Sequence, residues 1–343
     1  MTASDPHISA QRQGALGLLT LKRPQALNAL TTGMVRALDA ALAAWAGDAA
    51  VRVVAIRGEG PRAFCAGGDI RAWVTEGPDA GLAFLAAEYR LNHRIATFPK
   101  PFVALMHGVT MGGGAGLSVH ARHRIADPDL VFAMPETNIG FVPDIGSTFF
   151  LPRCPGQLGL YLALTAGRIG CGDAIAAGLA DACMRPADFD ALLEKLSAGD
   201  DAAEAIAALC LAPPPAALAP HRPVMAAMFS ATSVEGVLER LARDGGDFAR
   251  AAADAIRANA PTSLKLAFHL LRRGAGADLR QCLQQEYDAA THLLRRHDLA
   301  EGVRAAVIDK DRNPKWQPSA LAAISDADIA ALSAPSGTKL AFE

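Results

Sequence analysis

A cluster of glycines directly after an apolar run is the feature that most constrains this chain. Residues 101–106 (PFVALM) are apolar enough for a buried strand, and Gly112, Gly113 and Gly114 follow it closely. The next residues, 115–121, are small and apolar, which suits a helix packed closely on its neighbours. Glycines at a helix N-terminus leave free N–H groups and carry no side chains. An anionic oxygen can therefore approach the backbone directly.

A second glycine-rich turn lies upstream of the first. Residues 65–69 (CAGGD) follow the apolar stretch 51–56, which is predicted to be a strand. Tight packing of a strand on the next helix would explain either turn alone. The two turns together, with a carboxylate nearby in the sequence, instead favour a site in which two backbone N–H groups bind one substrate oxygen.

The N-terminal half repeats a unit of strand, loop and helix three times. The predicted strands cover 15–21, 51–56 and 101–106, the loop covers 58–69, and the helices cover 31–45, 80–96 and 115–121. A chain of 343 residues, 51% of them hydrophobic, has room for one large domain or two smaller ones. The pattern alone does not distinguish a spiral of such units from a doubly wound α/β sheet.

The character of the chain changes after residue 180. Before that point, short strands are predicted at 124–127 and 131–133 and helices at 156–164 and 171–177. The prolines of 213–223 exclude a helix or a central strand there. Amphipathic patterns then predict helices over 234–243, 248–258, 262–272 and 279–296, followed by a frayed tail over 335–343. The sequence thus predicts a core over residues 1–210, a linker over 211–223 and a helical region over 224–343.

Composition and charge exclude several classes of protein. The net charge of −2, without a run of lysines or arginines, argues against nucleic-acid binding. The first residues lack an apolar segment flanked by basic ones, and no uninterrupted apolar run of about 18 residues follows. We therefore expect a cytoplasmic protein that is neither secreted nor membrane-bound. The six cysteines have no short paired spacings, which favours reduced packing residues, and Cys65 is expected to be an apolar filler.

Several motifs together resemble the crotonase (enoyl-CoA hydratase/isomerase) superfamily. They are FCAGGDI at 64–70, HGVTMGGGAGLS at 107–118, FAMPETNIGFVPDIG at 132–146 and LALTAGRI at 162–169. Within this superfamily, MPET and PDIG, with PTSLK at 261–265 and EGVRAAVIDKDRNPKW at 301–316, resemble the 3-hydroxyisobutyryl-CoA hydrolases. The resemblance runs from about residue 18 to residue 316. It implies an α/β fold of the ββα-spiral type, whose helical C-terminal part packs over the acyl-CoA site or on a neighbouring subunit of a homo-oligomer.

Glu136 is the first candidate catalytic residue. It lies in FAMPETNIGF, whose apolar residues should thin its hydration and raise its pKa, as suits a base or a nucleophile. A glutamate after a proline is otherwise typical of a helix N-terminus. The resemblance places Glu136 at the superfamily's catalytic position.

Two further carboxylates join Glu136 through the resemblance. Asp144, in PDIG, would otherwise be a helix cap, but the hydrolases carry at this position an aspartate that works with the glutamate on the substrate. Glu88 matches a substrate-contacting position, although a charge on a helix surface would be unremarkable. The same alignment assigns the two oxyanion-binding N–H groups to Gly68 and Gly113.

Other chemistries find less support. Hydratases of the superfamily carry a second glutamate three residues after the central oxyanion-hole glycine, where this chain has Gly116. His120 and His123 have a spacing that would suit a metal, but no carboxylate completes such a site and the resemblance implies none. Neither G-x-S-x-G nor G-x-x-x-x-G-K-[ST] is present, so Ser118 is not expected to be a nucleophile and the glycines are not expected to form a P-loop.

The resemblance implies a thioesterase that converts 3-hydroxyisobutyryl-CoA to 3-hydroxyisobutyrate and CoA in valine breakdown. No metal or redox cofactor is expected, because the CoA thioester supplies the leaving group. An enoyl-CoA isomerase and a non-catalytic acyl-CoA-binding protein are the alternatives. The sequence leaves open the oligomeric state, the choice between 3-hydroxyisobutyryl and 3-hydroxypropionyl chains, and whether Glu136 attacks directly or activates water.

Overall fold

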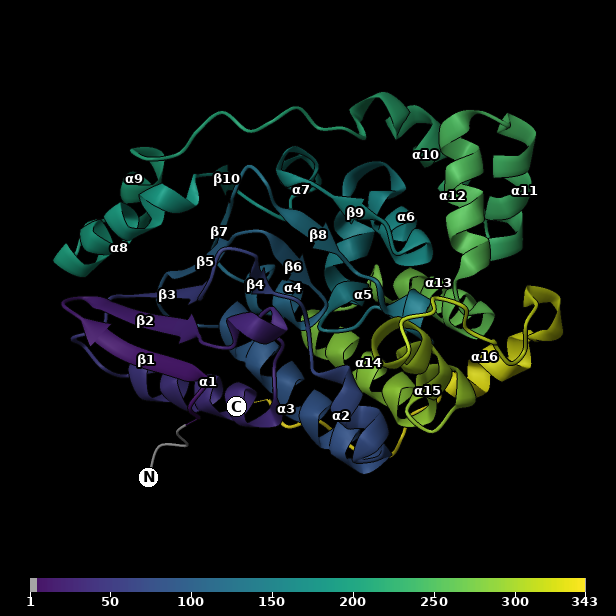
Figure 1. Ribbon diagram of the computed structural model, residues 1–343, viewed down its shortest axis with the longest axis horizontal. Helices are drawn as coiled ribbons and strands as arrows, with labels where there is room; N and C mark the ends of the chain where they lie inside the picture. Colours follow the sequence, from purple (N-terminus) through teal and green to yellow (C-terminus); the bar gives the residue numbers. More distant parts are fainter. Residues whose placement is uncertain (1–4, 343) are drawn as a thin grey trace.

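The computed structural model describes residues 5–342, and its N-terminal part is built around two sheets (Figure 1). The larger sheet has six strands in the order β1-β2-β3-β5-β7-β10. These strands are β1 (Ile8–Gln13), β2 (Leu16–Leu21), β3 (Val53–Gly58), β5 (Phe102–Met106), β7 (His123–Ala126) and β10 (Ala182–Cys183). Strands β1 and β2 pair antiparallel, and all later pairs in this sheet are parallel.

The smaller sheet interleaves with the larger one along the chain. Its order is β4-β6-β8-β9, formed by β4 (Ala63–Cys65), β6 (Val109–Met111), β8 (Val131–Ala133) and β9 (Arg168–Ile169). Each of β3, β5 and β7 in the large sheet is followed at once by a strand of the small sheet. The chain therefore winds as a ββα spiral, and the fold expected from the resemblance is confirmed. The predicted loop 58–69 was wrong in one respect, because it contains β4.

Strands β2, β3 and β5 of the large sheet are buried over most of their length on both faces, which explains their mostly apolar sequences. On β3, Val54 and Ile56 join the main core, while Val53 and Ala55 join a second cluster. Helices α1 (Thr32–Ala46) and α3 (Pro78–Ala96) lie on the main-core side, and α8 (Phe189–Ala198) and α9 (Ala202–Ala207) cover the other face (Figure 1).

The remaining helices of the spiral are short. They are α2 (Ile70–Thr75), α4 (Gly113–Ser118), α5 (Ser147–Phe150), α6 (Leu158–Thr165) and α7 (Cys171–Ala177). Strand β1 has no counterpart in the prediction, because its sequence ISAQRQ is mostly polar and exposed. It is held by its antiparallel pairing with β2, a contact that apolar periodicity does not reveal.

The proline-rich stretch is shorter and more tightly packed than predicted. Residues 212–218 are irregular and run along the top of the molecule in Figure 1, where Leu218 N–H donates to the Asp173 side chain at 2.9 Å. Helix α10 (Arg222–Phe229) then starts inside the expected linker. Pro223 is accommodated because it lies in the first helical turn, where a missing N–H costs nothing. The three-part division itself, whose first four residues lie outside the described range, stays a prediction.

The C-terminal part is helical, as predicted. It contains α11 (Val234–Asp244), α12 (Asp247–Ala258), α13 (Pro261–Gly274), α14 (Leu279–Leu293), α15 (His297–Val303) and α16 (Asp326–Leu332). Helix α14 packs on α3 and α5, and α15 packs on α2, so these helices cover the spiral core. Within residues 5–342 no helix is long and apolar enough to cross a membrane.

The C-terminal tail is packed, which corrects the expectation of a frayed end. The Ser336 backbone N–H and hydroxyl both donate to Asp288, and Leu340 N–H donates to the Gln284 side chain. Phe342 lies against the His93 ring, with the ring centroids 4.8 Å apart. These hydrogen bonds, together with the buried Leu340 and the partly buried Phe342, anchor the tail to α3 and α14. The last residue of the predicted tail, Glu343, lies outside the described residues.

Candidate active site

The two glycine turns meet at one point. Gly67 follows β4 with φ +110°, and a Cβ placed on it would lie 3.6 Å from Gly113 N and 3.8 Å from Gly112 Cα. Gly112 has φ +49° and immediately precedes α4. These backbone conformations favour glycine, and the absence of side chains allows the two turns to come together.

Gly68 and Gly113 present N–H groups at this meeting point. Leu30 N–H donates to Gly67 O and Leu30 O accepts from Asp69 N–H, so the intervening Gly68 N–H faces away from Leu30. Gly113 is the first residue of α4, whose N–H has no partner within the helix. Both glycines line the same cavity. Their placement suits the predicted oxyanion pair, and the role itself stays a prediction.

Glu136 opens the short 3₁₀ turn Glu136–Ile139 after β8, and only 6% of it is exposed. A Cβ on Gly112 would lie 3.1 Å from Glu136 Oε1, while Oε2 has no hydrogen-bond partner among residues 5–342. Burial, reinforced by the nearby Asp144 carboxylate, raises the pKa of Glu136 well above its usual range. Trp73 and Phe141, whose ring centroids are 5.6 Å apart, form part of the apolar wall.

Asp144 is buried on the same cavity and is not a helix cap. Its backbone oxygen accepts from Ser147 N–H, whereas its carboxylate oxygen Oδ2 accepts from Tyr89 O–H at 2.7 Å. Burial raises the pKa of Asp144 to about 7, and the hydrogen bond from Tyr89 acts in the opposite direction. The capping alternative is therefore wrong.

Glu88 comes from α3 and is 2% exposed, so the alternative of a surface charge is also wrong. Its Oε1 has no hydrogen-bond partner in the described part of the chain and lies close to Gly113, where an added Cβ would sit only 2.3 Å away. Burial, followed by the charge of Asp144, raises the pKa of Glu88 well above its usual range. Glu88 thus faces the central glycine turn.

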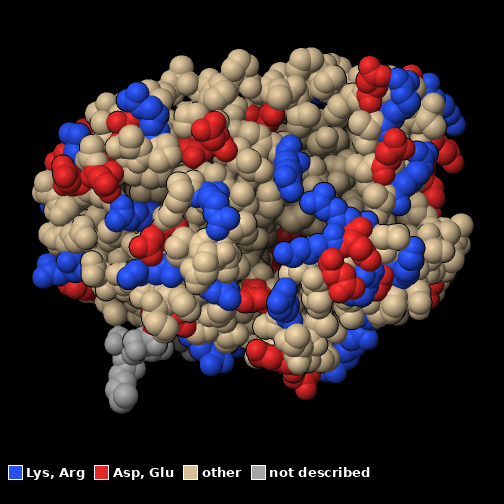
Figure 2. Space-filling view, viewed as in Figure 1, with Lys and Arg blue, Asp and Glu red and all other residues tan. Residues whose placement is uncertain are grey.

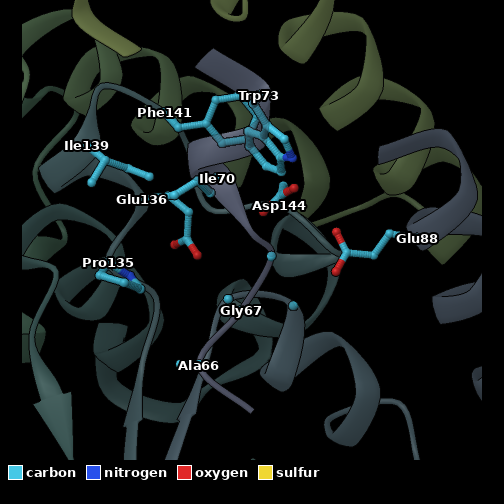
Figure 3. A pocket seen from close by; sticks show the side chains of 13 residues that line it. Ala66, Gly67, Ile70, Trp73, Glu88, Pro135, Glu136, Ile139, Phe141 and Asp144 are labelled. Carbon is cyan, nitrogen blue, oxygen red and sulfur yellow. The ribbon is translucent and has the colours of Figure 1, made fainter. Parts of the chain in front are cut away.

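These side chains surround one cavity of about 80 Å³ (Figure 3). Its lining consists of Ala66, Gly67, Gly68, Ile70, Trp73, Glu88, Gly112, Gly113, Pro135, Glu136, Ile139, Phe141 and Asp144. All five residues singled out from the sequence belong to this set. Carboxyl groups so close together in an apolar setting cannot all be ionised without a donor or a cation, so at least one is poised to hold or take up a proton.

Sequence reasoning missed two supporting residues, Tyr89 and Glu286. Tyr89 follows Glu88 on α3. Its aromatic ring fits the apolar face of that helix, so the sequence pattern predicts only a packing role for it. Glu286 lies on α14, is fully buried, and accepts from Gly146 N–H at 2.7 Å and from Thr148 N–H at 2.8 Å. Burial raises the pKa of Glu286 to about 8. The sequence holds no local signal for such contacts, because Glu286 and Gly146 are 140 residues apart.

His120 and Cys65 have local structural roles that need no metal and no reactive thiol. His120 Nε2 lies 2.7 Å from Ile145 O, and burial lowers the pKa of the ring to about 4. Residues 5–342 contain no group of three or more His, Cys, Asp or Glu side chains arranged to hold a metal. Burial raises the pKa of the Cys65 thiol to about 12, as suits a packing residue. The described cysteines are all free thiols.

The model of the enoyl-CoA hydratase/isomerase family matches residues 16–332. This chain belongs to that family. Among curated relatives, the 3-hydroxyisobutyryl-CoA hydrolase of Xenopus tropicalis is 42% identical, with 95% of this chain and 88% of the relative covered. The Homo sapiens protein of the same name is 38% identical over 96% of this chain and 88% of its own. Both relatives are named as mitochondrial. The cytoplasmic location expected from the sequence stays a prediction for this chain.

Two solved structures are similar over nearly the whole chain. A carnitinyl-CoA dehydratase from Mycobacterium thermoresistibile superposes with a TM-score of 0.94 at 37% identity, with 99% of each chain covered. An enoyl-CoA hydratase from Rhodobacter sphaeroides gives a TM-score of 0.90 at 41% identity, covering 96% of this chain and 98% of the other. The names of these relatives thus divide between thioester hydrolysis and reactions at a double bond, and the residues of the site must discriminate between the two kinds of reaction.

Proposed function

We propose that this protein is an acyl-CoA thioesterase that hydrolyses 3-hydroxyisobutyryl-CoA to 3-hydroxyisobutyrate and CoA, as in valine breakdown. One observation carries the proposal: Glu136 presents an unpartnered carboxylate oxygen in the cavity where the Gly68 and Gly113 turns meet, with Asp144 beside it. The curated relatives bearing this name, 38–42% identical over about 95% of the chain, support the same reading.

The chemistry follows from these positions. The thioester carbonyl oxygen accepts from Gly68 N–H and Gly113 N–H, which stabilise the negative charge that develops on it. Glu136 takes a proton from water as the water oxygen bonds to the acyl carbon. When the carbonyl re-forms, the C–S bond breaks and the CoA sulfur takes that proton from Glu136. Direct attack by Glu136 gives the same products through an enzyme-bound anhydride, which hydroxylamine would trap.

Asp144 and Glu88 define the acyl end of the site in this proposal. Asp144 accepts a hydrogen bond from the substrate 3-hydroxyl, and Glu88 contacts the substrate beside Gly113.

No metal or redox cofactor takes part, because the thioester carries its own leaving group. Lysine and arginine side chains surround a hollow near the middle of the face in Figure 2, which suits an anionic, phosphate-bearing ligand such as CoA.

Hydration of a double bond is the second candidate, since the two solved structures are named for such reactions. The site disfavours it. Hydratases of the family use a second glutamate at the position of Gly116, and a Cβ placed there would lie 2.7 Å from Asn92 Nδ2 and 3.0 Å from Ile145 Cβ. The carboxylate is missing, and neighbouring side chains occupy its space.

A panel of CoA thioesters tests the proposal. Purified protein is incubated with 3-hydroxyisobutyryl-, 3-hydroxypropionyl-, isobutyryl- and crotonyl-CoA, and free thiol is followed with a chromogenic reagent while chromatography detects hydration or isomerisation products. We expect rapid release of CoA from the hydroxylated thioesters. Formation of 3-hydroxybutyryl-CoA from crotonyl-CoA at a comparable rate would favour a hydratase, and binding without any turnover would favour a non-catalytic protein.

A further inference from the structure

The turn that carries Asp144 has an unfavourable backbone. Ile145 has φ +57° and Gly146 has φ +85°, so two consecutive residues adopt left-handed conformations. A β-branched residue such as isoleucine rarely does so, because its side chain clashes with the backbone. The conformation that places Asp144 on the cavity is therefore imposed by contacts from outside the turn.

Those contacts come mainly from one side chain of the C-terminal part. Glu286 Oε2 accepts from Gly146 N–H at 2.7 Å, and Oε1 accepts from Thr148 N–H at 2.8 Å and Thr148 Oγ1 at 2.7 Å. The network continues outward, since Gln285 Nε2 donates to Thr148 Oγ1 at 2.8 Å. On the other side of the turn, His120 Nε2 forms a hydrogen bond with Ile145 O at 2.7 Å.

Glu286 does not line the cavity, so it does not touch a substrate there. It is fully buried, and its three donors engage both of its oxygens. We propose that Glu286 is a positioning residue: by holding the left-handed turn, it keeps the Asp144 carboxylate directed at the acyl group beside Glu136. The role given to Asp144 in this inference rests on the proposed function. The effect of Glu286 on the geometry of the turn does not.

The chemistry of the donors explains why a carboxylate is required here. Three donors approach the two oxygens of Glu286 and lower its pKa, against the effect of burial, so they favour the ionised carboxylate. An amide of the same size has only one oxygen. In Glu286→Gln the NH₂ group faces a backbone N–H, so one donor is left unpaired in a buried place. The variant preserves the volume of the side chain and breaks the contact, which makes it a clean test.

A double-mutant cycle separates positioning from a general structural role. We expect Glu286→Gln to lower kcat for 3-hydroxyisobutyryl-CoA by about tenfold or more, with KM changed less than about threefold. In an Asp144→Asn background the same substitution should change kcat by less than about twofold, because the residue it positions is already disabled. Equal losses in both backgrounds would show that Glu286 does not act through Asp144.

Two further measurements make the test independent of folding and of activity. Glu235→Gln is the matched control: Glu235 lies on α11, away from the cavity, where it pairs with Lys265 at 2.7 Å. The Glu235→Gln variant should leave kcat unchanged.

Amide hydrogen exchange of a peptide covering residues 141–150 should be faster in Glu286→Gln and unchanged in Glu235→Gln. Unchanged exchange in Glu286→Gln overturns the inference, even if the wild type hydrolyses none of the thioesters and the proposed function fails.

Discussion

Glu136 and Asp144 differ in what their carboxylate oxygens contact. Asp144 Oδ2 is fixed by the Tyr89 hydroxyl, whereas Glu136 Oε2 has no partner in the part of the chain that the structure describes. A buried polar atom without a partner costs folding free energy, of the order of 1–3 kcal/mol, so it calls for a functional explanation. The contrast supports separate roles, with Glu136 reacting and Asp144 orienting.

The first prediction concerns Glu136. Glu136→Gln keeps the shape of the side chain but removes the base, so thioester hydrolysis should fall below about a tenth of the wild-type kcat. Binding of CoA, measured by calorimetry, and the circular dichroism spectrum should both remain unchanged. Retention of more than that tenth would remove Glu136 from the reaction.

The second prediction concerns the substrate hydroxyl. Isobutyryl-CoA lacks the donor that Asp144 is expected to accept from, and sites built around such a bond reject the unsubstituted analogue by up to about 10⁴-fold. Asp144→Ala should therefore impair turnover of the hydroxylated thioester much more than turnover of isobutyryl-CoA. Values of kcat/KM for both compounds provide the measurement. A wild-type preference within about tenfold would point to a general acyl-CoA thioesterase.

The third prediction concerns Tyr89. Its hydrogen bond lowers the pKa of Asp144, so Tyr89→Phe should raise that pKa further above the present value of about 7. If the ionised form of Asp144 binds the hydroxyl, the acid limb of the pH profile of kcat/KM moves to higher pH in the variant. The phenylalanine retains the edge-to-face packing on Tyr287, where the ring centroids are 6.4 Å apart. A profile that does not move would separate Tyr89 from the titration of Asp144.

At the level of secondary-structure elements, α3 and α4 set the width of the site. Glu88 on α3 lies close to Gly113 on α4. The next residue, Gly114, lies against Cys65 at the end of β4, the strand that precedes the glycine turn with Gly67 and Gly68. A Cβ on Gly113 would meet the end of the Glu88 side chain at 2.3 Å, whereas a Cβ on Gly114 would meet the backbone oxygen of Cys65 at 2.1 Å. A side chain can shift aside, and a buried backbone cannot.

The fourth prediction follows from that difference. Gly113→Ala keeps the backbone N–H but places a methyl group against the end of the Glu88 side chain, beside the position of the substrate oxygen. It should lower kcat by up to about 10²–10³, the effect of moving the substrate oxygen away from one oxyanion donor, with a small change in Tm. Gly114→Ala should instead destabilise the fold by about 1–3 kcal/mol through overpacking. Gly47→Ala is the control for both, since no atom lies within 4 Å of a Cβ placed there. Comparable losses of stability in Gly113→Ala and Gly114→Ala would refute this separation.

The elements also show how far the sequence could predict the structure. Helix α7 has the predicted bounds, and most other strands and helices agree within a few residues, because apolar periodicity reports local burial. The candidate residues from Gly68 to Asp144, which were found through the resemblance, all line one cavity. Tyr89 and Glu286 escaped notice because their contacts join elements distant in sequence, and β1 did so because pairing rather than burial holds it.

In the molecule as a whole, the C-terminal helices complete the site of their own chain. Helix α14 brings Glu286 to the Asp144 turn, and α15 packs on α2 and on the turn that begins with Glu136. This arrangement places four carboxyl groups, those of Glu88, Glu136, Asp144 and Glu286, in one buried region. The charges of that region should therefore influence the stability of the entire fold.

The fifth prediction is a dependence of stability on pH. Burial raises the pKa of Asp144 from 3.8 to about 7, so this group binds more protons in the folded state than in the unfolded state between these limits. A raised carboxyl pKa favours folding at low pH, and that contribution is lost as pH rises through the folded pKa. The contribution of Asp144 to the free energy of unfolding should then fall between pH 5 and 7, by up to about 1.4 kcal/mol per pH unit.

Urea unfolding of the wild type and of Asp144→Asn at several pH values between 5 and 8 measures this dependence. His120 acts in the opposite direction, since burial lowers its pKa to about 4, and the contribution of Asp144 is therefore taken from the difference between wild type and variant. Asp144→Asn removes one of the raised groups and should therefore flatten the slope, because its amide does not titrate. A difference between wild type and Asp144→Asn that stays constant from pH 5 to 8 would mean that Asp144 is ionised in the folded protein and stabilised there by the Tyr89 hydroxyl.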